Sequence, residues 1–208
     1  MAAIQNNQRS TMNYSTRFEL TPSGHWGNSV DNIHIFEDLL LTDELAELFR
    51  YAKCNDDWSA VYGHHQWSDR VHRDFTESTA KHICDNLYVK TKNLLETMFG
   101  VLVDSAGVQM NRWRVGDEQS PHADKQELDG STNCCPTYDL SSVFYVNDDF
   151  EGGEIFFPIQ SFTAKPAKNM VIMFPGDINY IHGVNTVTSG IRYTVSTFWT
   201  VKEIRSVL

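Results

Sequence analysis

The stretch 190-GIRYTVSTFW-199 predicts a β-strand that carries a cation on its inward face. Side chains alternate between the two faces of a strand, so one face holds Arg192, Thr194, Ser196 and Phe198. A guanidinium buried inside a barrel without a partner would be very costly in free energy. A carboxylate is the anion that best matches its paired N–H donors. The stretch therefore predicts an anion pocket at Arg192, with Ser196 favoured over Thr194 as an added hydroxyl donor. A salt bridge at the rim is the alternative.

Four further stretches share this period of two residues, at 108–115, 140–147, 154–157 and 170–174. In the second of them, Tyr145 lies on one face with Ser141 and Val143, from which its phenol can reach the same anion. Upstream, a period of 3.6 residues predicts a helix with Thr42 as its N-cap and a longer helix over 78–99. Helices followed by a run of strands predict an α+β fold with a sandwich or jelly-roll barrel.

The composition of the 208 residues is that of a soluble globular protein. We predict a flexible N-terminal arm over the polar residues 1–27 and a single domain over residues 28–208. The net charge of −10 repels phosphate groups, which argues against nucleic acid or a membrane surface as a partner. The four cysteines form no Cys-x-x-Cys pair and no apolar leader is visible, so we expect reduced thiols in a cytoplasmic protein.

His122, Asp124 and His182 are the ligand types of a mononuclear metal site. In an extended segment, residues i and i+2 point to the same side, so His122 and Asp124 converge on one point. A second imidazole from His182 would complete the two-histidine, one-carboxylate set that suits non-haem Fe(II) and leaves positions open. Zinc-dependent hydrolysis uses similar ligands, but the sequence lacks the general base of an H-E-x-x-H motif. Because H-x-D pairs also occur by chance, the prediction depends on all three residues coming together.

The sequence from about residue 108 to residue 200 resembles the Fe(II)/2-oxoglutarate-dependent oxygenases, and within them the prolyl 4-hydroxylase-like group. The matching pieces occur in the family's order and spacing: Trp113-Arg-Val-Gly116, Pro121-His-Ala-Asp124, Leu140-Ser-Ser-Val-Phe-Tyr-Val-Asn-Asp148, Phe150-Glu-Gly-Gly-Glu154, Phe174-Pro-Gly176, His182-Gly183, Gly190-Ile-Arg192 and Trp199. The resemblance implies a double-stranded β-helix core at about 108–201, supported by the N-terminal helices.

The resemblance also implies roles for individual residues. Fe(II) would be bound by His122, Asp124 and His182, and the far carboxylate of 2-oxoglutarate by Arg192 with help from Tyr145. O2 would drive decarboxylation to succinate and CO2 and the hydroxylation of a substrate C–H bond, with ascorbate as a supportive reductant. Asp124 favours hydroxylation, because halogenating relatives lack this carboxylate.

Two positions differ from many relatives. Prolyl hydroxylases of this group often have Lys where this chain has Arg192, and either cation can serve. Some relatives have Tyr where this chain has Trp113. The indole offers only an N–H donor, so the part that Trp113 takes in the cosubstrate site stays open.

The substrate is expected to enter between two loops, the aromatic-rich segment 58–75 and the turn-like segment 125–137. Trp58, Tyr62 and Trp67 either stack on a proline ring or an extended peptide, or pack a helix onto the sheet. We expect hydroxylation of prolyl residues in a peptide or protein. Alternatives are hydroxylation of a free amino acid or other small metabolite, a catalytically idle β-helix that serves as a binding module, and, less favoured, nucleic-acid dealkylation.

Overall fold

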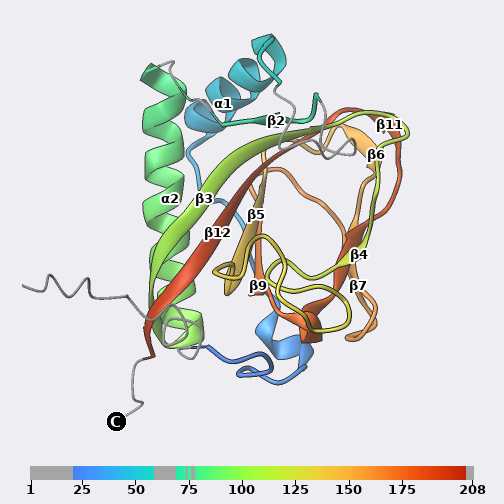
Figure 1. The fold of residues 1–208 in the computed structure, drawn as a ribbon. Helices are drawn as coiled ribbons and strands as arrows, with labels where there is room; N and C mark the ends of the chain where they lie inside the picture. Colours follow the sequence, from blue (N-terminus) through green and yellow to red (C-terminus); the bar gives the residue numbers. More distant parts are fainter. Residues whose placement is uncertain (1–20, 59–68, 74, 76–77, 205–208) are drawn as a thin grey trace, which may run out of the picture.

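The computed structural model describes residues 21–58, 69–73, 75 and 78–204. Two β-sheets form the body of the protein (Figure 1). The larger sheet has the strand order β1-β9-β5-β12-β3-β2, and its strands are His34–Phe36, Val171–Pro175, Leu140–Tyr145, Arg192–Ile204, Val101–Trp113 and Val71–His72. The smaller sheet has the order β4-β10-β7-β8, and its strands are Gln119–His122, His182–Val184, Ile155–Phe157 and Phe162–Ala164. A two-stranded sheet joins β11 (Val187–Gly190) to β6 (Phe150–Gly152).

The two main sheets enclose an apolar interior in the arrangement of a double-stranded β-helix. Tyr145 from the larger sheet and Phe157 from the smaller sheet belong to one buried cluster, together with Phe174 at the end of β9. Neighbouring strands of each sheet are antiparallel, and β12 pairs with β3 from Arg192 to Ile204. The predicted α+β class and the β-helix core are therefore confirmed.

Two α-helices cover the outer face of the larger sheet (Figure 1). They are α1 (Thr42–Cys54) and α2 (Ser78–Phe99), and short 3-10 turns occur at Val30–Asn32 and Ile178–Tyr180. The ring of Tyr88 on α2 stacks on that of Trp199 on β12, with centroids 5.1 Å apart. No helix within the described part of the chain is long and apolar enough to cross a membrane.

The end of α2 shows how local sequence sets the topology. Gly100 adopts a φ of +64°, a left-handed conformation that glycine reaches without steric cost and that commonly ends helices. The chain then turns directly into β3, which begins at Val101 and not at the predicted residue 108. The backbone N–H of Val103 donates to Glu96 Oε1 at 3.0 Å, which ties the strand back to the helix.

The prediction of a flexible arm up to residue 27 is wrong for its last seven residues. Residues 1–20 lie outside the described part, but the Thr21 hydroxyl donates to Asp139 Oδ1 at 2.6 Å. Lys125 Nζ donates to both the Thr21 carbonyl and Asp139. Trp26 packs edge-on against Phe99 at 5.6 Å. A polar composition does not distinguish a mobile segment from one that hydrogen-bonds a partner far along the chain.

The predicted aromatic loop is partly sheet. Val71 and His72 form β2 and pair with Asn111 and Met110 of β3. Trp58 is buried in the core, with its ring 4.6 Å from the Arg112 guanidinium, so this aromatic residue takes the packing role. Tyr62 and Trp67 lie outside the described residues. The segment 125–137 contains no strand, as predicted.

The contact between α2 and the sheet gives a test of stability. We predict that Leu95→Ala lowers the free energy of unfolding by about 2–5 kcal/mol, because Leu95 is fully buried and the change leaves a cavity. Val89→Ala on the exposed side of the same helix is the control, and its effect should be small and in the stabilising direction. Urea unfolding followed by circular dichroism measures both, and equal effects of the two changes would contradict the packing described.

Candidate metal and cosubstrate site

Strand pairing brings the two predicted histidines together. His122 on β4 lies directly opposite His182 on β10 in the antiparallel register, and their ring centroids are 4.4 Å apart. Asp124 follows β4 immediately; its Oδ1 lies 3.5 Å from His122 Nε2 and its Oδ2 lies 3.8 Å from His182 Nε2. One ligand atom from each residue lies within 4.8 Å of the other two. The three residues thus form a compact set with one carboxylate and two imidazole donors.

Backbone carbonyls orient both imidazoles. His122 Nδ1 contacts the Ser120 carbonyl and His182 Nδ1 contacts the Tyr180 carbonyl, each at 3.1 Å. A carbonyl can only accept, so a neutral ring carries its proton on Nδ1 and leaves the Nε2 lone pair directed inward. Metal-binding histidines are typically held in this way through their second nitrogen. The donor set therefore fits a metal ion.

The electrostatics favour the protonation states that a metal requires in two of the three residues, Asp124 and His182. In the third, His122, burial lowers the pKa but the neighbouring Asp124 outweighs it and raises the pKa. Burial acts to raise the pKa of Asp124, but His182, His122 and the Ser141 hydroxyl outweigh it and lower this pKa to about 2. Burial, assisted by His122, lowers the pKa of His182 to about 4. At neutral pH, Asp124 is thus a carboxylate and His182 is a neutral imidazole.

Further contacts hold Asp124 in place. Ser141 on β5 donates its hydroxyl to Asp124 Oδ2 at 2.5 Å. The Asp124 backbone N–H donates to the Gly176 carbonyl at 2.9 Å, and Asn133 Nδ2 donates to the Asp124 carbonyl at 3.0 Å. The sequence pattern places Ser141 on the same face of its strand as Tyr145 but indicates no contact with Asp124. The larger sheet therefore supports a residue that lies just beyond the end of β4 in the smaller sheet.

Gly183 directly follows His182 on β10, and the close packing around it explains why glycine occurs there. A Cβ atom at Gly183 would lie 2.5 Å from the Phe156 ring and 2.8 Å from the Gln119 carbonyl. Both are closer than real Cβ contacts allow. Glycine at this position thus permits β10 to lie close to its two neighbouring strands.

Arg192 is buried at the other end of the same interior, with only 1% of its surface exposed. Its guanidinium lies between the ring of Trp113 at 5.1 Å and the ring of Tyr145 at 4.9 Å. Nη2 donates to the Tyr145 hydroxyl at 3.3 Å, whereas Nε and Nη1 have no hydrogen-bond partner among the described residues. Thr194 Oγ1 on the same face of β12 is likewise without a partner in this part of the chain. These buried donors fit a carboxylate, as predicted.

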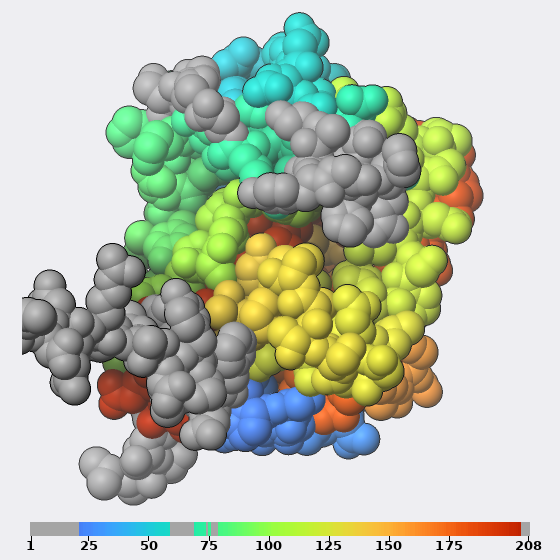
Figure 2. All heavy atoms as spheres, in the orientation of Figure 1, coloured from blue at the N-terminus to red at the C-terminus, as the bar shows by residue number. Residues whose placement is uncertain are grey.

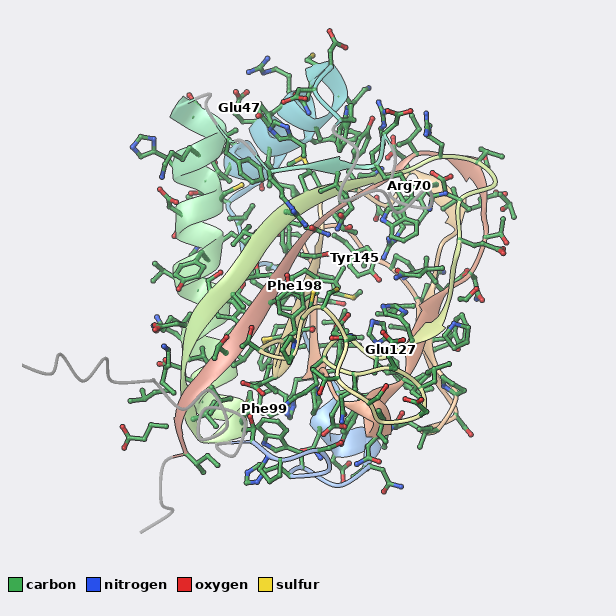
Figure 3. The ribbon with its side chains drawn as sticks, in the orientation of Figure 1. Glu47, Arg70, Phe99, Glu127, Tyr145 and Phe198 are labelled. Carbon is green, nitrogen blue, oxygen red and sulfur yellow. The ribbon has the colours of Figure 1, made fainter. Side chains whose placement is uncertain are left out.

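One cavity of about 70 Å³ extends from the His122–Asp124–His182 set to Arg192. Its wall includes His122, Asp124 and His182 on one side and Arg192 and Trp113 on the other. Figure 3 shows Tyr145 and Phe198 between the two sheets, on the inner side of the larger one. In Figure 2, the yellow segment around residue 130 lies on the face of the molecule beside a hollow. The structure thus brings the predicted site residues to a single cavity, except Tyr145, which lies behind the wall in contact with Arg192.

Two predicted cosubstrate residues make contacts that the sequence left open. Trp113 pairs with Arg192 across β3 and β12 and supports the guanidinium with its ring face. Ser196 lines the cavity and accepts a hydrogen bond from Asn111 Nδ2 at 2.7 Å. Asn111 and Gln109 also line the cavity and were missed. The alternation of β3 puts both on the inner face with Trp113, which is the signal that could have identified them.

Comparison with known proteins agrees with this geometry. Residues 108–200 match the family model described as the 2OG-Fe(II) oxygenase superfamily. This part of the chain is a domain of the 2OG-Fe(II) oxygenase superfamily. Members of this superfamily use Fe(II), 2-oxoglutarate and O2. The cofactors that the resemblance implied are thus confirmed for the family.

Curated relatives of this chain include prolyl 3-hydroxylase 2 from Homo sapiens, which is 33% identical over 150 residues, and its counterpart from Gallus gallus, which is 32% identical. Each alignment covers 66% of this chain but only 21% of the relative. The chain therefore spans about a fifth of the length of these proteins.

Solved structures show the same fold at lower identity. The viral collagen prolyl hydroxylase from Paramecium Bursaria Chlorella virus-1 has a TM-score of 0.62 and 18% identity, and the alignment covers 81% of this chain and 95% of that one. A 2OG-Fe(II) oxygenase family oxidoreductase from Burkholderia pseudomallei has a TM-score of 0.63 and 19% identity, with coverage of 85% and 89%. At these identities the likeness concerns the fold alone.

The contact between Ser141 and Asp124 gives a test of the metal site. We predict that Ser141→Ala weakens Mn(II) binding by about 10- to 100-fold, because it removes the hydroxyl that orients this carboxylate. Titration calorimetry of the purified protein measures the affinity. The neighbouring Ser142→Ala is the control, since Ser142 bonds Trp199 and the Thr197 carbonyl instead. Equal losses of affinity in both variants would contradict a specific role for Ser141.

Proposed function

We propose that this protein is an Fe(II)- and 2-oxoglutarate-dependent dioxygenase that hydroxylates prolyl residues of a peptide or protein and releases succinate and CO2. The observation that carries the proposal is the pairing of two features in one cavity. A His122–Asp124–His182 set lies at one end, and a buried guanidinium with N–H groups that no described residue accepts lies at the other.

The residues of the cavity divide the work. His122, Asp124 and His182 would hold the iron, and the Arg192 guanidinium would bind the far carboxylate of 2-oxoglutarate through bidentate hydrogen bonds. The Tyr145 oxygen accepts from Arg192, so its own proton is available to the same carboxylate. When bound, the iron and cosubstrate supply the oxidising chemistry with O2, and the protein supplies orientation and excludes water.

The choice of prolyl residues is supported by the relatives, whose names describe prolyl 3-hydroxylases. Their names also suggest the 3-position of the ring as the site of hydroxylation, whereas the sequence motifs resemble the prolyl 4-hydroxylase-like group. A peptide substrate fits a cavity whose neighbouring segment 125–137 is a loop on the surface (Figure 2). We also propose a cytoplasmic location, which the four free cysteines support.

A direct assay tests the substrate class. The protein is incubated with Fe(II), 2-oxoglutarate and proline-rich peptides, and mass spectrometry follows the gain of one oxygen atom on the peptide. Peptide hydroxylation coupled to succinate release is the expected result. Turnover of a free amino acid without peptide hydroxylation would replace the proposal by a small-molecule hydroxylase, and no succinate at all would favour a binding module.

Arg192 gives the matching prediction for the cosubstrate. Arg192→Met should raise the KM for 2-oxoglutarate by at least about 30-fold, corresponding to roughly 2 kcal/mol or more, because a buried ionic hydrogen bond to the carboxylate is lost. Arg192→Lys retains a cation and should recover part of the affinity. Succinate release at varied 2-oxoglutarate concentrations measures both variants. An unchanged KM in the Met variant would exclude this residue as the anchor.

A further inference from the structure

A chain of four polar side chains runs from the protein surface into the cavity. The exposed Arg73 donates to Gln109 Oε1 from Nη2 at 2.9 Å and from Nε at 3.3 Å. Gln109 Nε2 donates to Asn111 Oδ1 at 3.0 Å, and Asn111 Nδ2 donates to Ser196 Oγ at 2.7 Å. Gln109, Asn111 and Ser196 are buried and line the cavity.

Arg73 sets the direction of every bond in this chain. A guanidinium has donors only, so Gln109 must turn its oxygen toward Arg73 and its NH2 group toward Asn111. Asn111 must then accept with its oxygen and donate with its own NH2 group to Ser196. Without a pure donor at the start, both amides could rotate by 180° and the chain could run in either direction. Bonds aligned in one direction also polarise and strengthen each other.

The chain ends on a hydroxyl that remains free to donate. Ser196 Oγ accepts from Asn111, and no acceptor for its proton is found within the described residues. On β5, Val143 lies opposite Ser196, and Ser141 lies opposite the next inward residue of β12, Phe198. Because Ser141 bonds Asp124, Ser196 lies toward the metal ligands, while Arg192 lies four residues away at the other end of the cavity.

We propose that Arg73 and Gln109 are positioning residues which fix Ser196 as a hydrogen-bond donor to the metal-chelating end of 2-oxoglutarate. This proposal rests on the function proposed above and extends it to two residues outside the metal set and the Arg192 pocket. Arg192 then recognises the far carboxylate, and the chain from Arg73 recognises the 2-oxo acid end. Selectivity for 2-oxoglutarate over a plain dicarboxylate would depend in part on a residue at the surface.

The isosteric change Gln109→Glu tests the direction of the chain. A glutamate still accepts from Arg73 but cannot donate to Asn111, so Asn111 turns its NH2 group toward Glu and its oxygen toward Ser196. The Ser196 proton is then drawn to Asn111 and lost to the ligand. We expect this variant, like Ser196→Ala, to bind 2-oxoglutarate about 3- to 10-fold more weakly, the range of one hydrogen bond. Arg73→Met should give a smaller loss in the same direction, and Arg73→Lys, which also only donates, should restore the affinity.

Binding is measured by titration calorimetry on protein loaded with Zn(II), which supports no turnover, with 2-oxoglutarate and succinate as the two ligands. Succinate lacks the 2-oxo acid end, so Gln109→Glu should lower the ratio of 2-oxoglutarate affinity to succinate affinity. The double variant Gln109→Glu/Ser196→Ala should show the same ratio of 2-oxoglutarate affinity to succinate affinity as the single variant Ser196→Ala. Arg50→Met, which changes an exposed arginine on α1, is the control and should alter neither affinity.

Equal weakening of both ligands by Gln109→Glu, or an unchanged ratio, would overturn this proposal and leave the proposed function intact. Failure of the unchanged protein to bind 2-oxoglutarate at all would instead refute the proposed function, and this inference with it. The two proposals therefore fail by different results.

Discussion

The burial of a guanidinium without a carboxylate partner in the described part of the chain is the constraint that shapes this protein. Arg192 contacts two aromatic rings and donates to one phenol, and two of its donor atoms have no partner among the residues that the structure describes. Ring faces and a phenol oxygen compensate a buried charge only in part. An anion that enters the cavity therefore gains interactions that water outside cannot supply at the same geometry. The long pairing of β12 with β3 and β5 keeps the cation at this depth.

Each main sheet supplies a different part of the site. In the smaller sheet, the antiparallel register of β4 and β10 places His122 directly opposite His182. The larger sheet carries Arg192, Tyr145 and the Ser141 hydroxyl. A shift of β4 by one residue relative to β10 would turn His122 to the opposite face, because side chains alternate along a strand. The hydrogen bond between Ser141 and Asp124 joins the sheets at the metal end. The distance between the His122–Asp124–His182 set and Arg192 is thus set by the packing of the two sheets.

The sequence allowed the clustering of these residues to be predicted, because period-two alternation needs no knowledge of strand partners. This alternation placed Arg192 and Ser196 on one face of their strand. It also predicted that the side chains of His122 and Asp124 converge. The sequence could not predict contacts that depend on the register between strands, such as the hydrogen bonds from Asn111 to Ser196 and from Ser141 to Asp124. The short strand β4 escaped prediction because Pro121 interrupts it, and proline is tolerated there since β4 lies at a sheet edge. Thr21 was assigned to an arm because its partner, Asp139, is 118 residues away.

Trp113 shows how a departure from a family pattern can be read from physical contacts. An indole cannot accept a hydrogen bond, so it cannot replace a phenol as a two-way partner at the cosubstrate. Its ring face instead lies 5.1 Å from Arg192 and 5.5 Å from Arg70, and Arg70 is paired with Asp117 at 2.6 Å. Trp113 therefore supports the Arg192 guanidinium with its ring face, while the Tyr145 phenol accepts a hydrogen bond from the same cation. At this position of β3 an indole holds the buried cation in place, and the phenol that contacts the cation comes from β5 instead.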